Sequence, residues 1–459
     1  MDKPTLLLLI LVLTTAGYYF GRKRSLDIVS GKVQELHSLP SYYGYYLAMW
    51  VGVPTLLLLL IWLGFEGAVL SRLVVADLPG ELQGDSGERA ALLINEIRNT
   101  MAGAGSGSGD PSIQAAANHY RHLQAVSDWL LSLGVIALAA LGGWFGHRQI
   151  EVEQRARNKV EKGTMVFLIA CSTIAIFTTV GIVLSVVFES VLFFQKVPVT
   201  DFLFGLRWSP QMAIRADQVG SSGAFGAVPL FTGTLLISFI AMVVAVPIGL
   251  MSAIYLAEYA SPRVRTVAKP LLEILAGVPT VVYGFFAALT VAPYIRDLGQ
   301  SLGLDVSSES ALAAGLVMGV MIIPFVSSLS DDFINAVPQS LRDGAYALGA
   351  TQSETIRQVI IPAALPGIVG GILLAVSRAI GETMIVVMAA GLSANLTANP
   401  LAAVTTVTTQ IVTLLVGDQE FDSPKTLAAF ALGLVLFLVT LMLNIAALMI
   451  VRKYREQYE

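Results

Sequence analysis

The sequence predicts an all-α, polytopic membrane protein with about nine transmembrane helices. Of its 459 residues, 55% are hydrophobic and only 13% are charged, and the mean hydropathy is +0.73. Soluble proteins carry about 25% charged residues, so this composition excludes an ordinary soluble domain. The chain has a single cysteine, Cys171, which excludes a disulfide framework or a multi-cysteine metal site within it. We expect no metal and no cofactor.

Apolar runs fix the positions of the predicted spans. A helix needs about 20 apolar residues to cross the hydrocarbon core of a bilayer. Suitable runs lie at 4–20, 44–65, 129–146, 164–194, 229–257, 271–293, 311–329, 367–392 and 426–450. Three positive charges, Arg22, Lys23 and Arg24, follow the first run instead of preceding it. Because a cleaved signal peptide has the reverse order, we expect an uncleaved first span.

The distribution of lysine and arginine predicts the orientation of the chain. Cytoplasmic segments of membrane proteins carry an excess of these residues. With the N-terminus outside, most of the positive charges fall in the inside segments, which are 21–43, 147–163, 258–270, 330–366 and 451–459. The sequence therefore predicts an N-terminus outside and a C-terminus in the cytoplasm.

The chain is predicted to divide into two parts, 1–160 and 161–459. The first part has three spans and a polar outside loop, 66–128, in which residues 103–109 read GAGSGSG, a composition typical of flexible linkers. The second part has six spans and one long inward loop, 330–366. That loop carries the most informative motifs in the sequence.

The inward loop 330–366 predicts two short helices, 338–348 and 352–360. The signals that bound them are Pro338, Gly349, the capping-box pair Thr351 and Glu354, and the helix-stopping Pro362 and Pro366. A polar helix–turn–helix of this kind is suited to docking into a groove on a soluble partner. From spacing alone, an amphipathic loop lying on the membrane surface explains the pattern equally well.

The same loop resembles the signature loop of ABC-importer permeases, E-A-A-x3-G-x9-I-x-L-P. The matching residues here are Asp343, Gly344, Ala345, Gly349, Val359, Ile361 and Pro362. The substitutions are conservative and leave the spacing intact. The resemblance implies that the first short helix is a coupling helix that sits in a cleft of a cytoplasmic ATPase, with contacts at Asp343, Gly344, Ala345, Gly349 and Pro362.

Further stretches resemble the high-affinity phosphate importer permeases of the PstC and PstA types, PstC more closely. They lie at 229–265, 269–287, 347–371 and 378–384, so the resemblance covers roughly 160–450. The first 150 residues look like an amino-terminal extension of longer members. The resemblance implies a six-helix ABC-importer permease core in the bacterial inner membrane, with a periplasmic N-terminus.

The family also implies partners. These are ATPase subunits of the PstB type, a second permease of the PstA type forming a heterodimer, a periplasmic phosphate-binding protein of the PstS type, and the lipid bilayer. No nucleic-acid partner is expected. ATP handling must lie in another subunit because the sequence contains no G-x4-G-K-[ST] loop; its one Gly-Lys pair, Gly31-Lys32, has Leu26 where the motif needs glycine. We therefore expect a transport subunit rather than an enzyme.

Two charges, Arg378 and Glu382, interrupt the predicted span 367–392 near its midpoint. An arginine there costs about 2.5–3.5 kcal/mol on insertion scales. On a continuous helix, positions four apart share a face, so the two side chains are expected to pair. One interpretation is a structural ion pair. The other is a phosphate path, in which the guanidinium binds the anion and Glu382 holds it in place, with Ser377 and Thr383 alongside. The resemblance to the phosphate permeases implies the second.

Two other acidic residues, Glu258 and Glu273, are expected to form ion pairs at the membrane interface. Three functions remain open besides phosphate import. The first is import of another oxyanion, such as sulfate, molybdate or phosphonate, which an arginine alone cannot distinguish. The second is a proton-coupled secondary transporter that uses the Arg378–Glu382 pair as a relay. The third is a membrane sensor or scaffold, although loop 66–128 shows no sensor-like sequence.

Overall fold

The computed structural model describes residues 1–76, 94–97, 111–210, 223–416 and 423–455. Within them the chain is almost wholly helical, apart from the short antiparallel strands β1 (Trp208–Ser209) and β2 (Ala224–Phe225). Nine described helices are long and apolar enough to cross a membrane, which confirms the predicted all-α fold and the number of spans. The predicted linker 103–109 lies outside the described residues.

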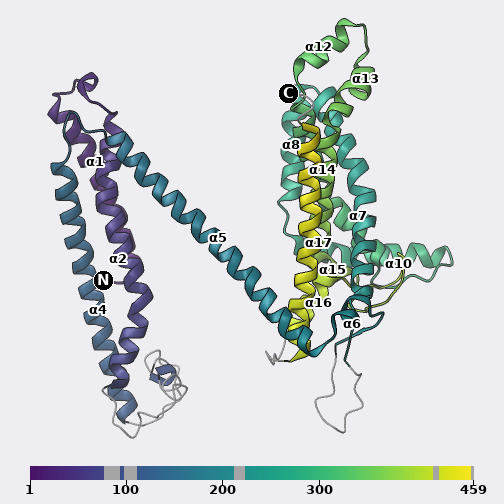
Figure 1. Cartoon of the computed structure of the whole chain (residues 1–459), viewed down its shortest axis with the longest axis horizontal. Coiled ribbons are helices and arrows are strands. Elements are labelled where there is room, and N and C mark those ends of the chain that lie inside the picture. The colour runs from purple at the N-terminus through teal and green to yellow at the C-terminus, as the bar shows by residue number, and fades with distance from the viewer. Residues whose placement is uncertain (77–93, 98–110, 211–222, 417–422, 456–459) are drawn as a thin grey trace. The chain divides into compact units, whose positions relative to one another are not determined.

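The chain forms two compact units, Met1–Phe177 and Thr178–Glu459 (Figure 1). The division falls inside helix α5 (Ala156–Lys196), as does the sequence-based boundary near residue 160.

Three long helices build the first unit: α1 (Lys3–Ile28), α2 (Pro40–Ala76) and α4 (Pro111–Arg148) (Figure 1). Both α2 and α4 extend into the loop predicted at 66–128. Small residues let these helices approach closely, as in other membrane bundles. A Cβ atom at Gly21 of α1 would lie only 2.6 Å from the carbonyl oxygen of Tyr43 in α2.

One buried charge in the first unit is fully partnered. Glu66, in α2, is 9% exposed and forms an ion pair with Lys3 of α1. Its other carboxylate oxygen accepts a hydrogen bond of 2.7 Å from the hydroxyl of Ser127 in α4. That hydroxyl in turn accepts a hydrogen bond of 2.9 Å from the indole nitrogen of Trp62. The network ties the three helices together.

The second unit is centred on α7 (Val228–Ile254) and α11 (Ala311–Asn335), which pack along each other. Glycines at the contact let side chains of the partner helix fit closely: a Cβ at Gly315 would lie 2.6 Å from Ile240 Cγ2. Among the described spans α11 is the most buried. Around this pair lie α14 (Ile361–Ile380) and α17 (Pro424–Arg455).

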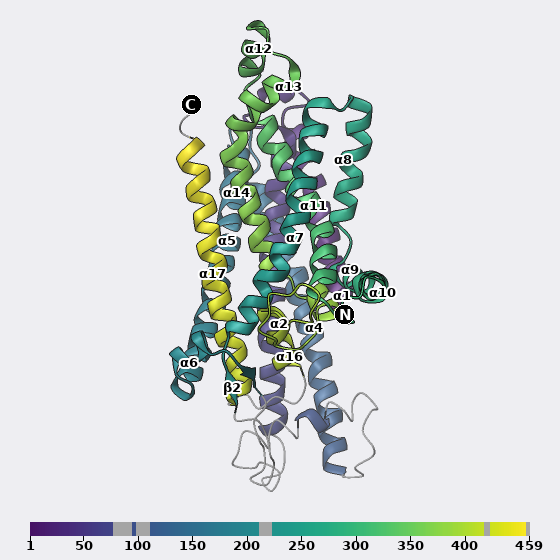
Figure 2. The same ribbon diagram turned by 90° about the vertical axis from the view of Figure 1, so that its right-hand side faces the viewer.

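The segments predicted to lie inside gather at one end of the second unit. Helices α12 (Gln339–Ala347) and α13 (Gln352–Thr355) lie there, while α6 (Val199–Phe204) and β2 lie at the other end (Figure 2). At that second end, Trp208 of β1 donates a hydrogen bond of 2.9 Å to Gln410 in α16 (Val407–Leu415). Which end faces the cytoplasm stays a prediction.

The predicted span 271–293 is wrong as a single helix. The chain instead forms α8 (Pro262–Ala276), α9 (Thr280–Phe286), a π-helical turn η3 (Ala287–Val291) and α10 (Ala292–Ser301). The break comes at Gly277, Val278 and Pro279. Proline disfavours helical geometry in the preceding residue and lacks the N–H needed to continue the helix, so Pro279 ends α8 and becomes the N-cap of α9.

The predicted span 367–392 is also interrupted. Helix α14 ends at Ile380, with Gly381 as its C-cap, and a short helix α15 (Met384–Ala389) follows. The prediction that Pro362 and Pro366 stop the preceding helix is wrong. The chain stays helical from α13 through a π-helical turn η4 (Ile356–Ile360) into α14. Pro362 directly follows the π-helical turn, at the start of the segment α14.

The two short helices predicted in the inward loop are present as α12 and α13 with η4. Pro338 is the N-cap of α12, and Gly349 follows it with φ of +83°, a conformation that favours glycine. The predicted capping box is confirmed: Thr351 Oγ1 accepts from the N–H of Glu354, and the Glu354 carboxylate accepts from the N–H of Thr351 at 2.8 Å.

Candidate functional site

Arg378 lies in the last turn of α14, where a positive charge is favoured by the helix dipole. Its side chain is exposed, and the guanidinium carbon lies 5.6 Å from the ring centre of Phe325 in α11. Within the described part of the chain it has no ion-pair partner and no hydrogen bond. The cation–π contact steadies the side chain and leaves its hydrogen-bond donors free.

Glu382 does not pair with Arg378, so that prediction is wrong. The helix ends between the two residues, at Gly381, and the four-residue spacing no longer places them on one face. The Glu382 carboxylate instead accepts hydrogen bonds from the backbone N–H groups of Met384 at 3.2 Å and Ile385 at 3.5 Å. Its backbone oxygen accepts a third bond of 2.8 Å from the hydroxyl of Thr408. Glu382 therefore shapes the break between α14 and α15.

Ser377 and Thr383 are half-buried and flank the same break. The Thr383 hydroxyl donates to the backbone oxygen of Gly381 at 3.4 Å. Neither residue lines the cavity that Arg378 enters, and neither does Glu382. Of the four residues predicted for the substrate path, only Arg378 lines this cavity.

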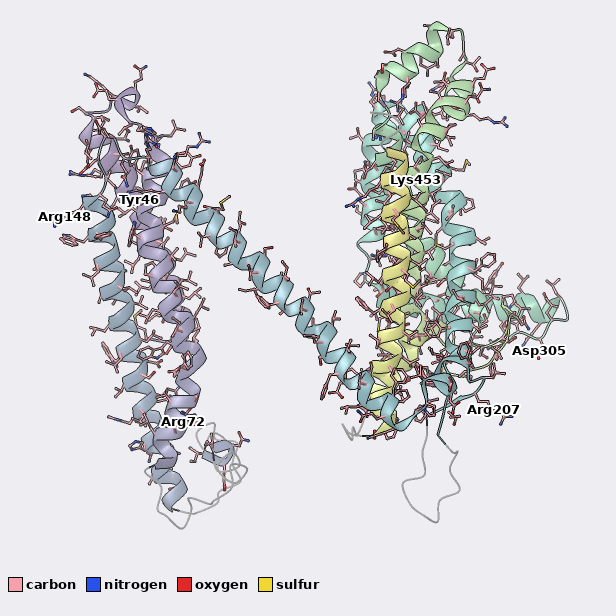
Figure 3. All side chains as sticks on the ribbon, viewed as in Figure 1. Tyr46, Arg72, Arg148, Arg207, Asp305 and Lys453 are labelled. Carbon is pink, nitrogen blue, oxygen red and sulfur yellow. The ribbon has the colours of Figure 1, made fainter. Side chains whose placement is uncertain are left out.

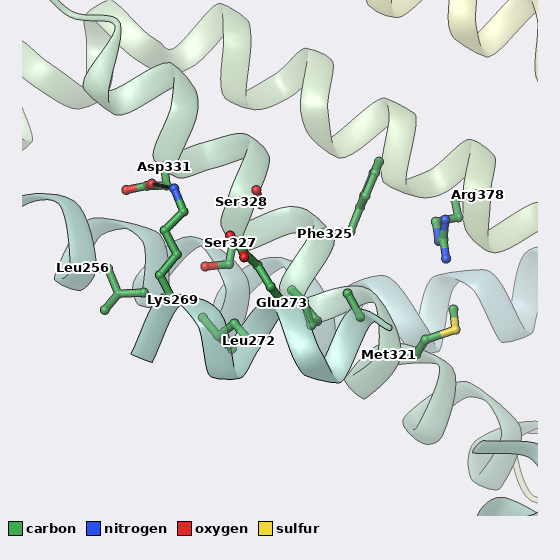
Figure 4. Close-up of a pocket in the computed structure, with 12 residues that line it drawn as sticks. Leu256, Lys269, Leu272, Glu273, Met321, Phe325, Ser327, Ser328, Asp331 and Arg378 are labelled. Atoms are coloured by element: carbon green, nitrogen blue, oxygen red, sulfur yellow. Dashed lines mark hydrogen bonds and ion pairs between the residues drawn. The ribbon is translucent and has the colours of Figure 1, made fainter. Parts of the chain in front are cut away.

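That cavity has a volume of about 300 Å³ and lies between α8 and α11 (Figure 4). Its lining residues are Leu256, Lys269, Leu272, Glu273, Ala276, Met321, Pro324, Phe325, Ser327, Ser328, Asp331 and Arg378. Arg378 stands at one end, Lys269 and Asp331 stand at the other, and Ser327 and Ser328 lie between them (Figure 4). The cavity thus combines an apolar wall with a line of polar groups.

A charge cluster closes the far end of the cavity. Asp331 of α11 is 3% exposed and pairs with two cations of α8. The distances from its carboxylate oxygens are 3.1 Å to Arg265 Nη2 and 2.8 Å to Lys269 Nζ. The hydrogen bond to Asp331 raises the pKa of Lys269 above its ordinary value. Buried carboxylates of this kind need such partners, because an unpaired buried charge is costly.

The two interfacial acids behave differently from each other. Glu258 forms an ion pair of 3.0 Å with Arg342, in agreement with its expected role. Glu273 lines the cavity and, among the described residues, has no ion pair. Lys269, which stands one turn before it on α8, is already engaged by Asp331. The expected ion pair of Glu273 is therefore not formed.

The sequence interpretation did not identify Lys269, Asp331, Ser327 and Ser328 as cavity residues. One signal was available: Arg265 and Lys269 are four apart and so share one face of a helix, which calls for an acidic partner. The acid that pairs with Arg265 and Lys269 is set by how α8 packs against α11. No sequence pattern within either helix predicts that packing.

The five predicted coupling residues do not share one environment. Asp343 is exposed and accepts a hydrogen bond of 3.1 Å from Gln339, while a Cβ at Gly344 would meet open space. Ala345 is buried, and Gly349 forms the turn after α12. Pro362 lies within the membrane helix α14, away from the turn.

Arg342 fastens α12 to the core of the second unit. Besides its ion pair with Glu258, its guanidinium donates to the backbone oxygens of Val337 at 2.6 Å and Ile334 at 2.8 Å. Gln352 of α13 donates to the backbone oxygen of Glu258 at 2.7 Å. The arm formed by α12 and α13 is thus held at both of its ends near the end of α7.

Two family models match the chain. Residues 7–178 match the model described as "Phosphate ATP-binding cassette transporter". Residues 245–456 match "Binding-protein-dependent transport system inner membrane component". The first match covers the segment that the sequence suggested to be an extension of longer permeases.

Curated relatives agree with these models. The "Probable ABC transporter permease protein YqgH" of Bacillus subtilis is 33% identical over 47% of this chain and 67% of its own length. PstC of Haemophilus influenzae, a phosphate transport system permease protein, is 35% identical over 30% of this chain and 49% of its own length. PstC 1 of Mycobacterium tuberculosis is 36% identical over 30% and 45%. The chain thus spans about half the length of these two PstC relatives, and the predicted resemblance to PstC-type permeases is confirmed.

Proposed function

The chain belongs to the ABC transporter permeases, in the branch that includes the phosphate transport permeases, and we propose that it passes inorganic phosphate from a periplasmic binding protein to the cytoplasm. The observation that carries this proposal is the free guanidinium of Arg378 at the end of a cavity lined by hydroxyls. A guanidinium offers a planar fork of donors that matches phosphate oxygens. Serine hydroxyls, as at Ser327 and Ser328, can donate to the same anion.

Because Glu382 does not pair with Arg378, the role proposed for Glu382 changes. In this proposal Arg378 is the charged contact for the phosphate, Ser327 and Ser328 add neutral hydrogen bonds, and Glu382 fixes the backbone break after Arg378. Ser377 and Thr383 lie beside the proposed path and contribute less to phosphate binding than Arg378. A single arginine without a second strong contact binds the anion weakly enough to release it, which conduction requires.

The proposal includes the partners and the orientation. Separate ATPase subunits hydrolyse ATP, a second permease completes the pathway, and a binding protein delivers phosphate on the periplasmic side. The chain lies in the bacterial inner membrane with its N-terminus in the periplasm and its C-terminus in the cytoplasm. Residues 1–160 form an N-terminal module and 161–459 the permease domain, in which Asp343, Gly344, Ala345 and Gly349 engage the ATPase. Pro362 acts from within the membrane helix that follows.

The structure supports the proton-coupled transporter less than it supports import of another oxyanion. A proton relay between Arg378 and Glu382 lacks its pair, because the two side chains do not meet. Another oxyanion, such as sulfate, molybdate or phosphonate, would meet the same guanidinium. Only a competition experiment separates these anions from phosphate.

The test is phosphate uptake by membranes that contain the complete importer, with Arg378→Gln compared with the original chain. We expect uptake to be lost while assembly and basal ATP hydrolysis stay unchanged. Arg452→Gln, an exposed arginine near the end of α17, is the matched control. Near-normal uptake by an intact Arg378→Gln complex would exclude Arg378 from the path. Stronger inhibition of transport by sulfate or molybdate than by unlabelled phosphate would reassign the substrate.

A further inference from the structure

The first unit contains a groove that the transport function does not use. It lies between α2 and the first turns of α5, beside the segment after α4, and has a volume of about 430 Å³. Its lining residues are Tyr46, Met49, Trp50, Val53, Pro54, Gln149, Lys159 and Lys162. All of them belong to the first unit.

The groove has an apolar floor. Met49, Trp50, Val53 and Pro54 follow one another along α2, within the predicted second span. The side chains of Trp50 and Val53 are 36% and 49% exposed, so they offer free surface to a hydrocarbon chain. Gly163 brings α5 directly against Met49, and this contact closes one side of the groove.

The mouth of the groove is polar and positive. Lys159 Nζ lies 5.1 Å from the ring centre of Tyr46, whose hydroxyl donates to the side-chain oxygen of Gln149. Lys159 and Lys162 are both exposed and are the only charged residues in the lining. The nearest acid in sequence, Glu161, is held by Arg157 through an ion pair of 2.6 Å. The two ammonium groups therefore remain available.

The position of the mouth, together with the predicted orientation of the chain, predicts the leaflet that it faces. Tyr46 and Arg148 lie at one end of the first unit, and Arg72 lies at the other (Figure 3). Segments 21–43 and 147–163, which meet at the Tyr46 end through the hydrogen bond from His37 to Val152, carry the positive charges that predict a cytoplasmic side. Anionic lipids give the cytoplasmic leaflet a negative surface, and basic pockets between transmembrane helices bind their headgroups.

We propose that this groove binds one anionic phospholipid. Lys159 and Lys162 hold the headgroup phosphate, and Gln149 lies beside them as a hydrogen-bonding group. One acyl chain lies along Trp50, Val53 and Pro54. Zwitterionic lipids fill the same apolar floor but gain less from the two lysines, so the site selects by charge. The inference stands apart from phosphate transport and is tested without it.

The test measures lipid retention by the purified full-length chain. Native mass spectrometry would count the phosphatidylglycerol and phosphatidylcholine molecules retained after titration with each lipid. The variant Lys159→Ala/Lys162→Ala removes both groove charges. Lys23→Ala/Arg24→Ala is the matched control, because it removes two exposed positive charges of the same unit outside the groove.

We expect the original chain to retain one phosphatidylglycerol in preference to phosphatidylcholine. The groove variant should lose this preference, with affinity for phosphatidylglycerol reduced about thirtyfold, since each of the two lysines near an anionic surface contributes about 1 kcal/mol. The control should change by less than a factor of about two. Equal losses in both variants would show a general surface-charge effect and overturn the proposal, as would equal retention of the two lipids. Trp50→Ala, which keeps both lysines, should weaken retention of both lipids alike.

Discussion

Glu66 and Arg378 are both charged residues within membrane helices, one in each unit, and the chain treats them in opposite ways. Glu66 is buried and satisfied by Lys3 and by the hydroxyl of Ser127. Arg378 is exposed to a cavity and, among the described residues, has no ion pair or hydrogen bond and makes a cation–π contact with the ring of Phe325. A charge that is buried and fully partnered holds helices together, whereas an unpartnered one at a cavity is available to a ligand.

The largest effect should come from Arg378. In Arg378→Gln, the loss of charge-assisted hydrogen bonds to phosphate costs about 3 kcal/mol, or about a hundredfold in uptake at low phosphate. Arg378→Lys keeps the charge but loses the planar fork, so we expect a loss of about tenfold. Uptake assays over a range of phosphate concentrations would measure both. Equal activity of the Lys and Gln variants would contradict recognition by charge and fork.

A second effect should come from Asp331, which is buried like Glu66 but belongs to the cavity. Asp331→Asn leaves Arg265 and Lys269 without their shared counter-charge. Because those two cations are about one-third exposed, we expect a loss of about 2 kcal/mol in the free energy of unfolding. Denaturant titration in mixed micelles would measure it. Asp332→Asn serves as the control, since no ion pair of Asp332 occurs among the described residues.

Glu66 should matter for stability and leave transport unchanged. Glu66→Gln keeps a partner for Ser127 but loses the ion pair with Lys3, which is itself 38% exposed, so we expect a loss of about 1 kcal/mol. Thermal denaturation together with phosphate uptake would check both halves of this expectation. Reduced uptake by a stable Glu66→Gln protein would remove the distinction between the two charges. Glu161→Gln, at an exposed ion pair, should leave both measurements unchanged.

The smallest effect should come from the residues flanking the break. Thr383→Ala and Ser377→Ala remove hydroxyls that do not line the cavity, so we expect uptake to fall by about twofold or less. The same uptake assay would compare them with Arg378→Gln. A loss in Thr383→Ala as large as that in Arg378→Gln would place the path along the break between α14 and α15.

The candidate site was only partly predictable from the sequence. Arg378 could be predicted as a candidate because placing an arginine in an apolar membrane segment costs free energy. That cost does not depend on where the helix ends. The pairing of Arg378 with Glu382 was mispredicted. Hydropathy alone makes 367–392 look like one continuous helix, whereas Gly381 ends α14 between the two residues.

The rest of the cavity depends on tertiary packing. Lys269 meets Asp331 because α8 lies against α11. The long apolar run at 271–293 concealed that α8 ends at Ala276. By contrast, the capping box at Thr351 and the turn at Gly349 were predictable, because each depends on residues within a few positions. Local signals predicted this cap and this turn, but they wrongly ended a helix at Pro362. Contacts between segments distant in the sequence build the candidate site.

The helical run that contains Arg378 also connects the cavity with the arm formed by α12 and α13. Residues 352–380 form one continuous helical run of 29 residues, about 40 Å long, which passes through Pro362 and Pro366. Its first turn is α13, which follows α12 in the arm, and its last turn carries the guanidinium of Arg378. The first non-helical residues come after Arg378, at Gly381. A displacement of the arm would therefore be transmitted along one continuous helix to Arg378, the proposed phosphate contact.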